Sequence, residues 1–121
     1  MIRRYRLSMS DRVNSTSELF SGLIRVHVLY HAARGPVFGL EMIRELRRHG
    51  YELSPGTLYP ILHGMERKGY LRSSRQLADG RFRRIYRATA GGRRALQEAR
   101  VKVRELFGEL LEDRRHVRSR T

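Results

Sequence analysis

Cysteine and tryptophan are both absent from the 121 residues of this chain, and only three residues are proline. Without cysteine the chain can form no disulfide, offers no thiolate to a zinc ion and has no cysteine nucleophile. No apolar run approaches the roughly 18 residues that a membrane-spanning helix needs. The N-terminal segment also lacks the apolar stretch of a secretory signal. These absences favour a small cytoplasmic protein that has no membrane partner.

Acidic residues are scarce as well. The chain has 26 Lys and Arg residues against 12 Asp and Glu residues, which gives a formal net charge of +14. From Arg67 to Arg94 the sequence contains ten cations and one acid, Asp79. Like charges at this density repel one another unless a polyanion or counterions offset them. The planar guanidinium group of arginine is also well suited to bind phosphates and the edges of guanine bases. The charge therefore favours nucleic acid as the partner over a generally basic, solvated surface.

The order of the expected elements is that of a winged helix-turn-helix. The apolar spacing and the capping residues predict helices at residues 15–17 to 34, 39–49 and 55–68, and strands at 71–77 and 81–88. Asp79-Gly80 is the dipeptide that tight hairpin turns prefer, and it stands between the two strands. We therefore predict a mainly α fold with a small β-hairpin wing.

A long C-terminal helix is predicted from its N-cap, Thr89, to about Asp113. Its apolar residues recur at alternating spacings of three and four, as in a coiled coil. Because the first helix also has a surplus apolar side, we favour a homodimer over packing of this stripe on its own domain. The predicted interface comprises Leu19, Leu23, Leu96, Ala99, Val103, Leu106, Phe107 and Leu110. The predicted organisation is a mobile basic arm (1–15), a winged helix-turn-helix (16–89), a dimerisation helix (90–113) and a basic tail (114–121).

The N-terminal end of the third helix is the predicted DNA-reading surface, because the second helix of a helix-turn-helix pair enters the major groove. Gly56 lets the backbone come close, and the hydroxyls of Thr57 and Tyr59 can reach phosphates or base edges. Pro60 offers an apolar surface to a thymine methyl group. The predicted DNA-binding residues are Ser54, Pro55, Gly56, Thr57, Tyr59, Pro60, His63 and Arg67 on the helix, and Arg81, Arg83 and Arg84 on the wing.

The sequence gives no indication of an enzyme, a cofactor or a metal site. It contains no Ser-His-Asp signature, no phosphate-binding glycine loop and no HExxH motif. His27 and His31 have the one-turn spacing of a metal-binding pair, but no third ligand lies near them in sequence and their neighbours are apolar. We therefore assign them to packing or to an interface and predict no metal.

The segment GPVFGLEMIRELRRHGYELSPGTLYPILHGMERKGYL (35–71) closely resembles the PadR family of transcriptional regulators. The segment RFRRIYRATAGGRRAL (81–96) is similar to the second wing strand and the start of the long helix in that family. The resemblance implies a winged-helix homodimer that represses transcription and is released by a small effector. The DNA-contacting positions of the family fall on Ser54, Gly56, Thr57, Tyr59 and Pro60 and on the wing arginines.

Two positions depart from the family pattern. Phe38 stands where the family commonly has a tyrosine, so a hydroxyl that would contact a phosphate is missing. His63-Gly64 replaces longer and more basic residues.

The resulting functional prediction is a regulator that binds a roughly palindromic operator, with Tyr30 and Phe107 lining a site for a small effector. The alternatives are a sequence-neutral architectural or RNA-binding protein, and an interaction adaptor whose winged helix no longer reads DNA.

Overall fold

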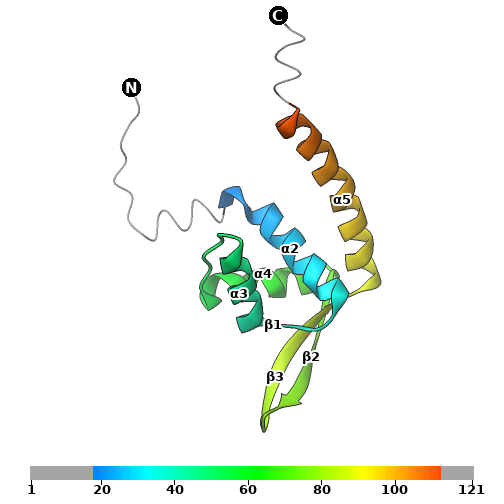
Figure 1. Cartoon of the computed structure of the whole chain (residues 1–121). Helices are drawn as coiled ribbons and strands as arrows, with labels where there is room; N and C mark the ends of the chain where they lie inside the picture. Colours follow the sequence, from blue (N-terminus) through cyan, green and yellow to red (C-terminus); the bar gives the residue numbers. More distant parts are fainter. Residues whose placement is uncertain (1–17, 113–121) are drawn as a thin grey trace, which may run out of the picture.

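The computed structural model describes residues 18–112 (Figure 1). Short helices and a β-hairpin form the first part of this region, and a long C-terminal helix follows them. The elements in chain order are α2 (Ser21–Arg34), β1 (Val37–Phe38), α3 (Gly39–Arg48), α4 (Pro55–Arg67), β2 (Leu71–Ala78), β3 (Arg81–Ala88) and α5 (Ala90–Leu111). This arrangement confirms the predicted mainly α winged helix-turn-helix. The predicted basic arm and basic tail lie outside the described residues, as do the predicted start of the first helix and end of the last.

The helix-turn-helix consists of α3, a short connection and α4. Gly50 follows α3 with a φ of 91°, a left-handed conformation that glycine adopts without strain. Ser54 precedes α4 as its N-cap residue and Pro55 occupies its first turn, as predicted. The carbonyl of Ser54 accepts the backbone N–H groups of Thr57 and Leu58 at 3.0 and 2.9 Å. These local bonds fix where the exposed first turn of α4 begins.

The wing is an antiparallel hairpin of β2 and β3 that projects from the helices (Figure 1). Asp79 and Gly80 have φ values of 53° and 76°, so both central residues of the turn are left-handed, as a type I′ hairpin turn requires. β1 adds a third strand, in the order β1-β3-β2. The sequence did not indicate β1, because Val37 and Phe38 are too few to show an alternating pattern.

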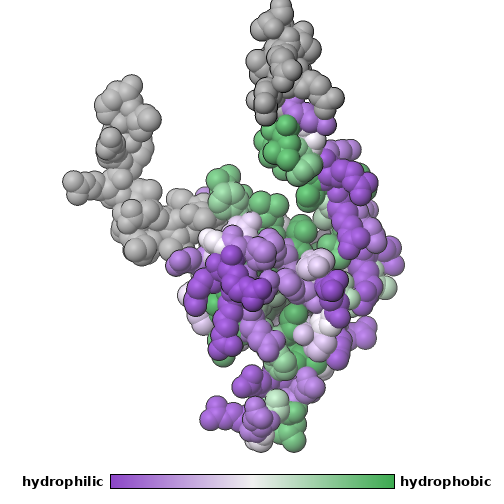
Figure 2. Space-filling model, in the orientation of Figure 1, coloured by the Kyte–Doolittle hydropathy of each residue, from purple (hydrophilic) through white to green (hydrophobic). Residues whose placement is uncertain are grey.

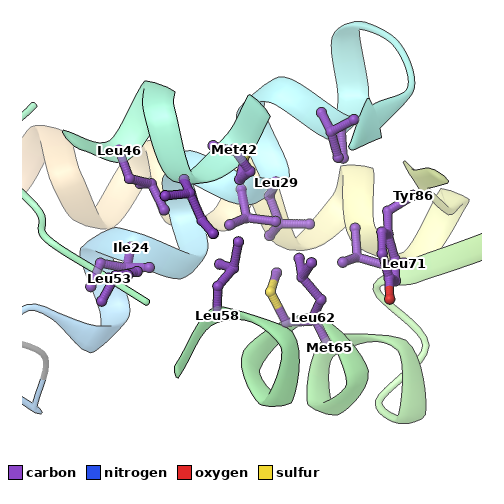
Figure 3. Close-up of a cluster of buried hydrophobic side chains, with 14 of the residues drawn as sticks. Ile24, Leu29, Met42, Leu46, Leu53, Leu58, Leu62, Met65, Leu71 and Tyr86 are labelled. Carbon is purple, nitrogen blue, oxygen red and sulfur yellow. The ribbon is translucent and has the colours of Figure 1, made fainter. Parts of the chain in front are cut away.

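The hydrophobic core draws on every element (Figure 3). Leu58 and Leu62 of α4 point into the centre of the cluster and are fully buried. Each such side chain contributes about 1.5–3 kcal/mol to folding, so the buried face of α4 determines which of its faces is presented to solvent. The residues labelled in Figure 3 are Ile24, Leu29, Met42, Leu46, Leu53, Leu58, Leu62, Met65, Leu71 and Tyr86.

α5 begins in the domain and then extends beyond it (Figure 1). Thr89 is its N-cap, as predicted, and the hydroxyl oxygen accepts the backbone N–H of Gly92 at 2.9 Å. The N–H of Thr89 donates to the carbonyl of Tyr70 at 3.0 Å, which ties the helix start to the wing base. Within residues 18–112 no helix combines the length and apolarity needed to cross a bilayer.

Candidate nucleic-acid interface

The first turn of α4 presents the residues that the sequence assigned to DNA reading. Ser54, Pro55 and Gly56 are exposed, and Thr57 is half-buried. The hydroxyls of Ser54 and Thr57 lie 3.3 Å apart, so they form a small polar group at the helix start, next to the backbone N–H of Gly56. This end of a helix attracts phosphate oxygens. Further along the same helix, Pro60, His63 and Arg67 are also exposed.

Tyr59 differs from the other predicted contacts because its ring is half-buried. It packs directly over Gly39, the first residue of α3, with no room there for a Cβ atom. Its ring lies 6.3 Å from that of His63. The face of α4 that is predicted to contact DNA is therefore not exposed along its whole length. Tyr59 joins α4 to the start of α3, with its hydroxyl packed over the buried Gly39.

The wing arginines fall into two kinds. Arg81 and Arg83 are exposed, and the guanidinium of Arg83 lies 5.7 Å from the centre of the Phe38 ring. Arg84 is also exposed but donates to the hydroxyl of Ser73 at 3.0 Å. That hydroxyl in turn donates to the Glu66 carboxylate at 2.8 Å, and the Ser73 N–H donates to the same oxygen at 3.1 Å. Arg84 is thus partly engaged within the protein.

A hollow of about 290 Å³ lies between the wing and the starts of α3 and α4. Its walls combine rings with guanidinium groups, the chemistry that binds the sugar-phosphate backbone of a nucleic acid. The sequence analysis noted Phe38 only as a departure from the family pattern and did not assign Leu40 to this surface, because both become neighbours of the wing only when β1 pairs with β3. The lining residues are Phe38, Gly39, Leu40, Tyr59, Arg81, Phe82, Arg83 and Arg84.

A second surface, on α5 and the start of α2, is apolar and exposed. Figure 2 shows apolar residues gathered at the free end of α5. Leu96 is an exception among the residues predicted for a dimer interface, because it is only 6 % exposed and belongs to the core of its own chain. Ala99 is half-buried. The other predicted interface residues are exposed: Leu19, Leu23, Val103, Leu106, Phe107 and Leu110.

A groove of about 890 Å³ runs between α2, α3 and α5. Tyr30 and Phe107, the two residues predicted to line an effector site, both lie on its wall. Its remaining lining includes His27, His31, Glu45, His49, Arg100 and Arg104.

The fold brings His27 and His31 of α2 close to Glu45 of α3 and to His49, the residue that follows α3. His49 and His31 lie 3.3 and 3.6 Å from the Glu45 carboxylate, and the rings of His27 and His49 are 4.7 Å apart. Burial lowers the pKa of His27, helped by His49 and His31, while Glu45 acts in the opposite direction. Within residues 18–112 no group of three or more potential ligands is placed to hold a metal ion.

The helix-turn-helix, the arginine-rich wing and the hollow between them define a winged helix-turn-helix DNA-binding protein. The sequence model of the transcriptional regulator PadR-like family matches residues 28–98, more than half of the chain, and the protein belongs to this family. It is thereby a DNA-binding regulator of transcription rather than an enzyme.

Individual relatives agree with this assignment. The chain is 50% identical over 94 residues to the transcriptional regulator Rv3488 of Mycobacterium tuberculosis, a match that covers 78% of this chain and 88% of that protein. It is 33% identical to a PadR family regulator from Eggerthella lenta, with a TM-score of 0.67 over 85% of this chain and 95% of the other. A Streptococcus transcriptional regulator shares the fold, with a TM-score of 0.72 at 22% identity over 79% of this chain and 96% of the other.

Proposed function

We propose that the protein is a cytoplasmic homodimeric repressor that binds a roughly palindromic operator. The observation that carries the proposal is the exposed first turn of α4 together with the hollow, which Tyr59 of the same helix and the arginines of the wing line. The predicted contacts on α4 reach base edges and phosphates in the major groove, and Arg81 and Arg83 neutralise the flanking phosphates. Repression is the direction that the resemblance to the PadR family implies.

Dimerisation is supported by the apolar side of α5. Phe107 and Leu110 are 60 % and 65 % exposed, and a row of such residues is stable in water when a second copy covers it. A two-fold dimer places two α4 helices about 34 Å apart, one turn of DNA, which is why the operator is expected to be an inverted repeat. The Leu110→Glu substitution should then shift the protein to monomers in sedimentation, whereas Glu109→Gln on the same turn should not.

Effector control is the third part of the proposal. The groove lined by Tyr30 and Phe107 suits a flat, apolar molecule, which would bind between helices that also set the spacing of the two α4 helices. Anilinonaphthalene sulfonate is a suitable probe, because its rings are flat and apolar. We expect its fluorescence to rise on binding and Phe107→Ala to weaken that rise. An unchanged rise in fluorescence with this variant would rule out the groove as the effector site.

The decisive experiment is selection from a random duplex library, followed by titration of the selected duplex and a scrambled control over a series of salt concentrations. We expect an inverted repeat bound roughly a thousandfold more tightly than the control. Thr57→Ala should reduce this ratio, whereas Arg83→Gln should weaken both duplexes alike and lower the salt slope by about one. Affinity that depends on salt but never distinguishes sequences, or equal affinity for RNA, would instead establish the sequence-neutral alternative.

A repressor and an activator are then separated by a reporter gene placed behind the selected operator. We expect expression of the reporter to fall when the protein is present and to return with Arg83→Gln. A rise in expression would reverse the proposed direction of regulation.

A further inference from the structure

The tip of the wing carries two apolar side chains that the DNA contacts described above do not use. Leu77 of β2 and Phe82 of β3 stand directly opposite each other, one residue pair before the turn. Such cross-strand pairs stabilise a hairpin, but this pairing leaves Leu77 61 % and Phe82 62 % exposed. Hairpin stability therefore does not account for an aromatic ring that remains mostly in water.

The surroundings of this pair are strongly cationic. The guanidinium of Arg75 lies 4.5 Å from the centre of the Phe82 ring, a stacking arrangement that covers part of the ring and holds it in place. Arg81 and Arg83 flank Phe82 in sequence and are exposed. Asp79 is the one acid in residues 71–88. A surface that is apolar at its centre and cationic at its rim is complementary to DNA, in which stacked bases with apolar faces lie between anionic phosphate backbones.

Phe82 also lies on the DNA-reading side of the molecule. It lines the hollow between the wing and the helices together with Tyr59 of α4. The hairpin extends away from α3 and α4 (Figure 1), so its tip reaches beyond the DNA segment that α4 would contact.

We propose that Phe82, backed by Leu77, is an apolar wedge that enters the minor groove beside the operator half-site and partly unstacks one base step. The proposal rests on the proposed function for its partner, duplex DNA. The arginines alone would position the wing on phosphates, to which a phenyl ring adds nothing. Between bases the ring leaves water and stacks, and this gain offsets part of the unstacking.

The wedge would add specificity without hydrogen bonds to bases. Pyrimidine–purine steps such as TA and CA unstack most easily. We therefore expect the selected operators to carry such a step at a fixed distance outside each half-site, at positions that α4 does not touch.

The test uses the full-length protein and the selected duplex, with 2-aminopurine placed in turn at each flanking step. The fluorescence of this base rises when it unstacks, so wild-type protein should produce a rise at one flanking step. Phe82→Thr keeps a residue that favours strands and every arginine. It should abolish the rise and weaken binding about tenfold, with an unchanged salt slope because the phosphate contacts are intact.

Two further variants keep the test decisive. Phe82→Leu preserves an apolar wedge and should retain the fluorescence rise, even if the threonine variant folds poorly. Gln76→Thr is the matched control: it is exposed on β2, next to Leu77 in sequence and therefore on the other face of the hairpin. It should behave like the wild type.

The outcomes separate this inference from the proposed function. If the wild type selects an operator but no flanking step responds, or if Phe82→Thr gives the wild-type rise and affinity, the wedge is overturned and the operator remains. If flanking steps respond on every bound duplex but no sequence is selected, the wedge stands and sequence-specific regulation fails.

Discussion

Replacement of Gly39 by alanine tests how the recognition helix is held against α3. Gly39 is buried, and a Cβ atom there would clash with the hydroxyl oxygen of Tyr59 and lie 2.5 Å from its Cζ and 2.8 Å from its Cε1. Non-bonded carbon atoms prefer separations of about 3.5–4.0 Å. The ring of Tyr59 must therefore move by about 1 Å, and the atoms that clash are at the free end of its side chain.

The size of the effect follows from this geometry. Overpacking of this kind costs about 1–3 kcal/mol, and alanine regains at most the roughly 0.5–1 kcal/mol that separates it from glycine inside a helix, because Gly39 is only the first residue of α3. We expect a net loss of about 1–2 kcal/mol in the free energy of unfolding. The displaced hydroxyl should also lose the phosphate contact that we propose for it, a hydrogen bond to a charged group worth about 1.5–3 kcal/mol, so operator binding should weaken by roughly tenfold or more.

Urea unfolding of four proteins measures the coupling: the wild type, Gly39→Ala, Tyr59→Ala and the double variant. When Tyr59 is alanine, the new Cβ enters vacant space, so Gly39→Ala should be neutral or slightly stabilising. The two substitutions should therefore couple by about 1–3 kcal/mol. Equal destabilisation by Gly39→Ala in both backgrounds would refute the contact, and unchanged operator affinity would refute the role of the tyrosine hydroxyl.

Three more predictions concern other parts of the chain. Gly92→Ala would bring a Cβ into a clash with the carbonyl oxygen of Tyr70, and because a backbone group cannot swing aside we expect the free energy of unfolding, measured with urea, to fall by about 3 kcal/mol. In contrast, a Cβ added at the neighbouring Gly91 would lie 3.4 Å from its nearest atom, so Gly91→Ala should be tolerated. Similar losses of stability in the two variants would contradict this account. Tyr86→Phe removes a fully buried hydroxyl that has no hydrogen-bond partner among the described residues, and should raise the free energy of unfolding by about 1 kcal/mol, so a clear fall would reveal a hidden partner. The lowered pKa of His27, caused first by burial, means that the unfolded chain takes up this proton before the folded chain does. Stability from this group should therefore be lost as the pH falls through the ordinary histidine pKa of about 6.5, and His27→Gln should flatten the dependence of Tm on pH between about 7.5 and 5; an unchanged slope would argue against it.

The features predicted correctly from the sequence depend on neighbouring residues. Asp79-Gly80 specifies a turn through its own backbone preferences, and Thr89 caps a helix that begins at the next residue. The features that were missed depend on residues far apart in sequence. Phe38 becomes a strand residue because it pairs with Ile85, and Leu96 is buried because the start of α5 packs into the core rather than on a second chain. Periodicity identifies an apolar stripe but does not say which chain covers it.

The same distinction applies to the arginines of the wing. They look equivalent in the sequence, but the fold gives them different partners. Arg84 donates to Ser73, whose hydroxyl and N–H both donate to Glu66 of α4. This chain of bonds fixes the wing against α4, the helix that we propose reads DNA, and so sets the orientation of the two elements relative to each other. It also gives Arg84 an acid nearby, which offsets part of its attraction for a phosphate. Arg81 and Arg83 have no ion-pair partner within residues 18–112. Among the three predicted wing contacts, Arg81 and Arg83 should therefore contribute more to the electrostatic attraction for DNA than Arg84, which contributes through the position of the hairpin.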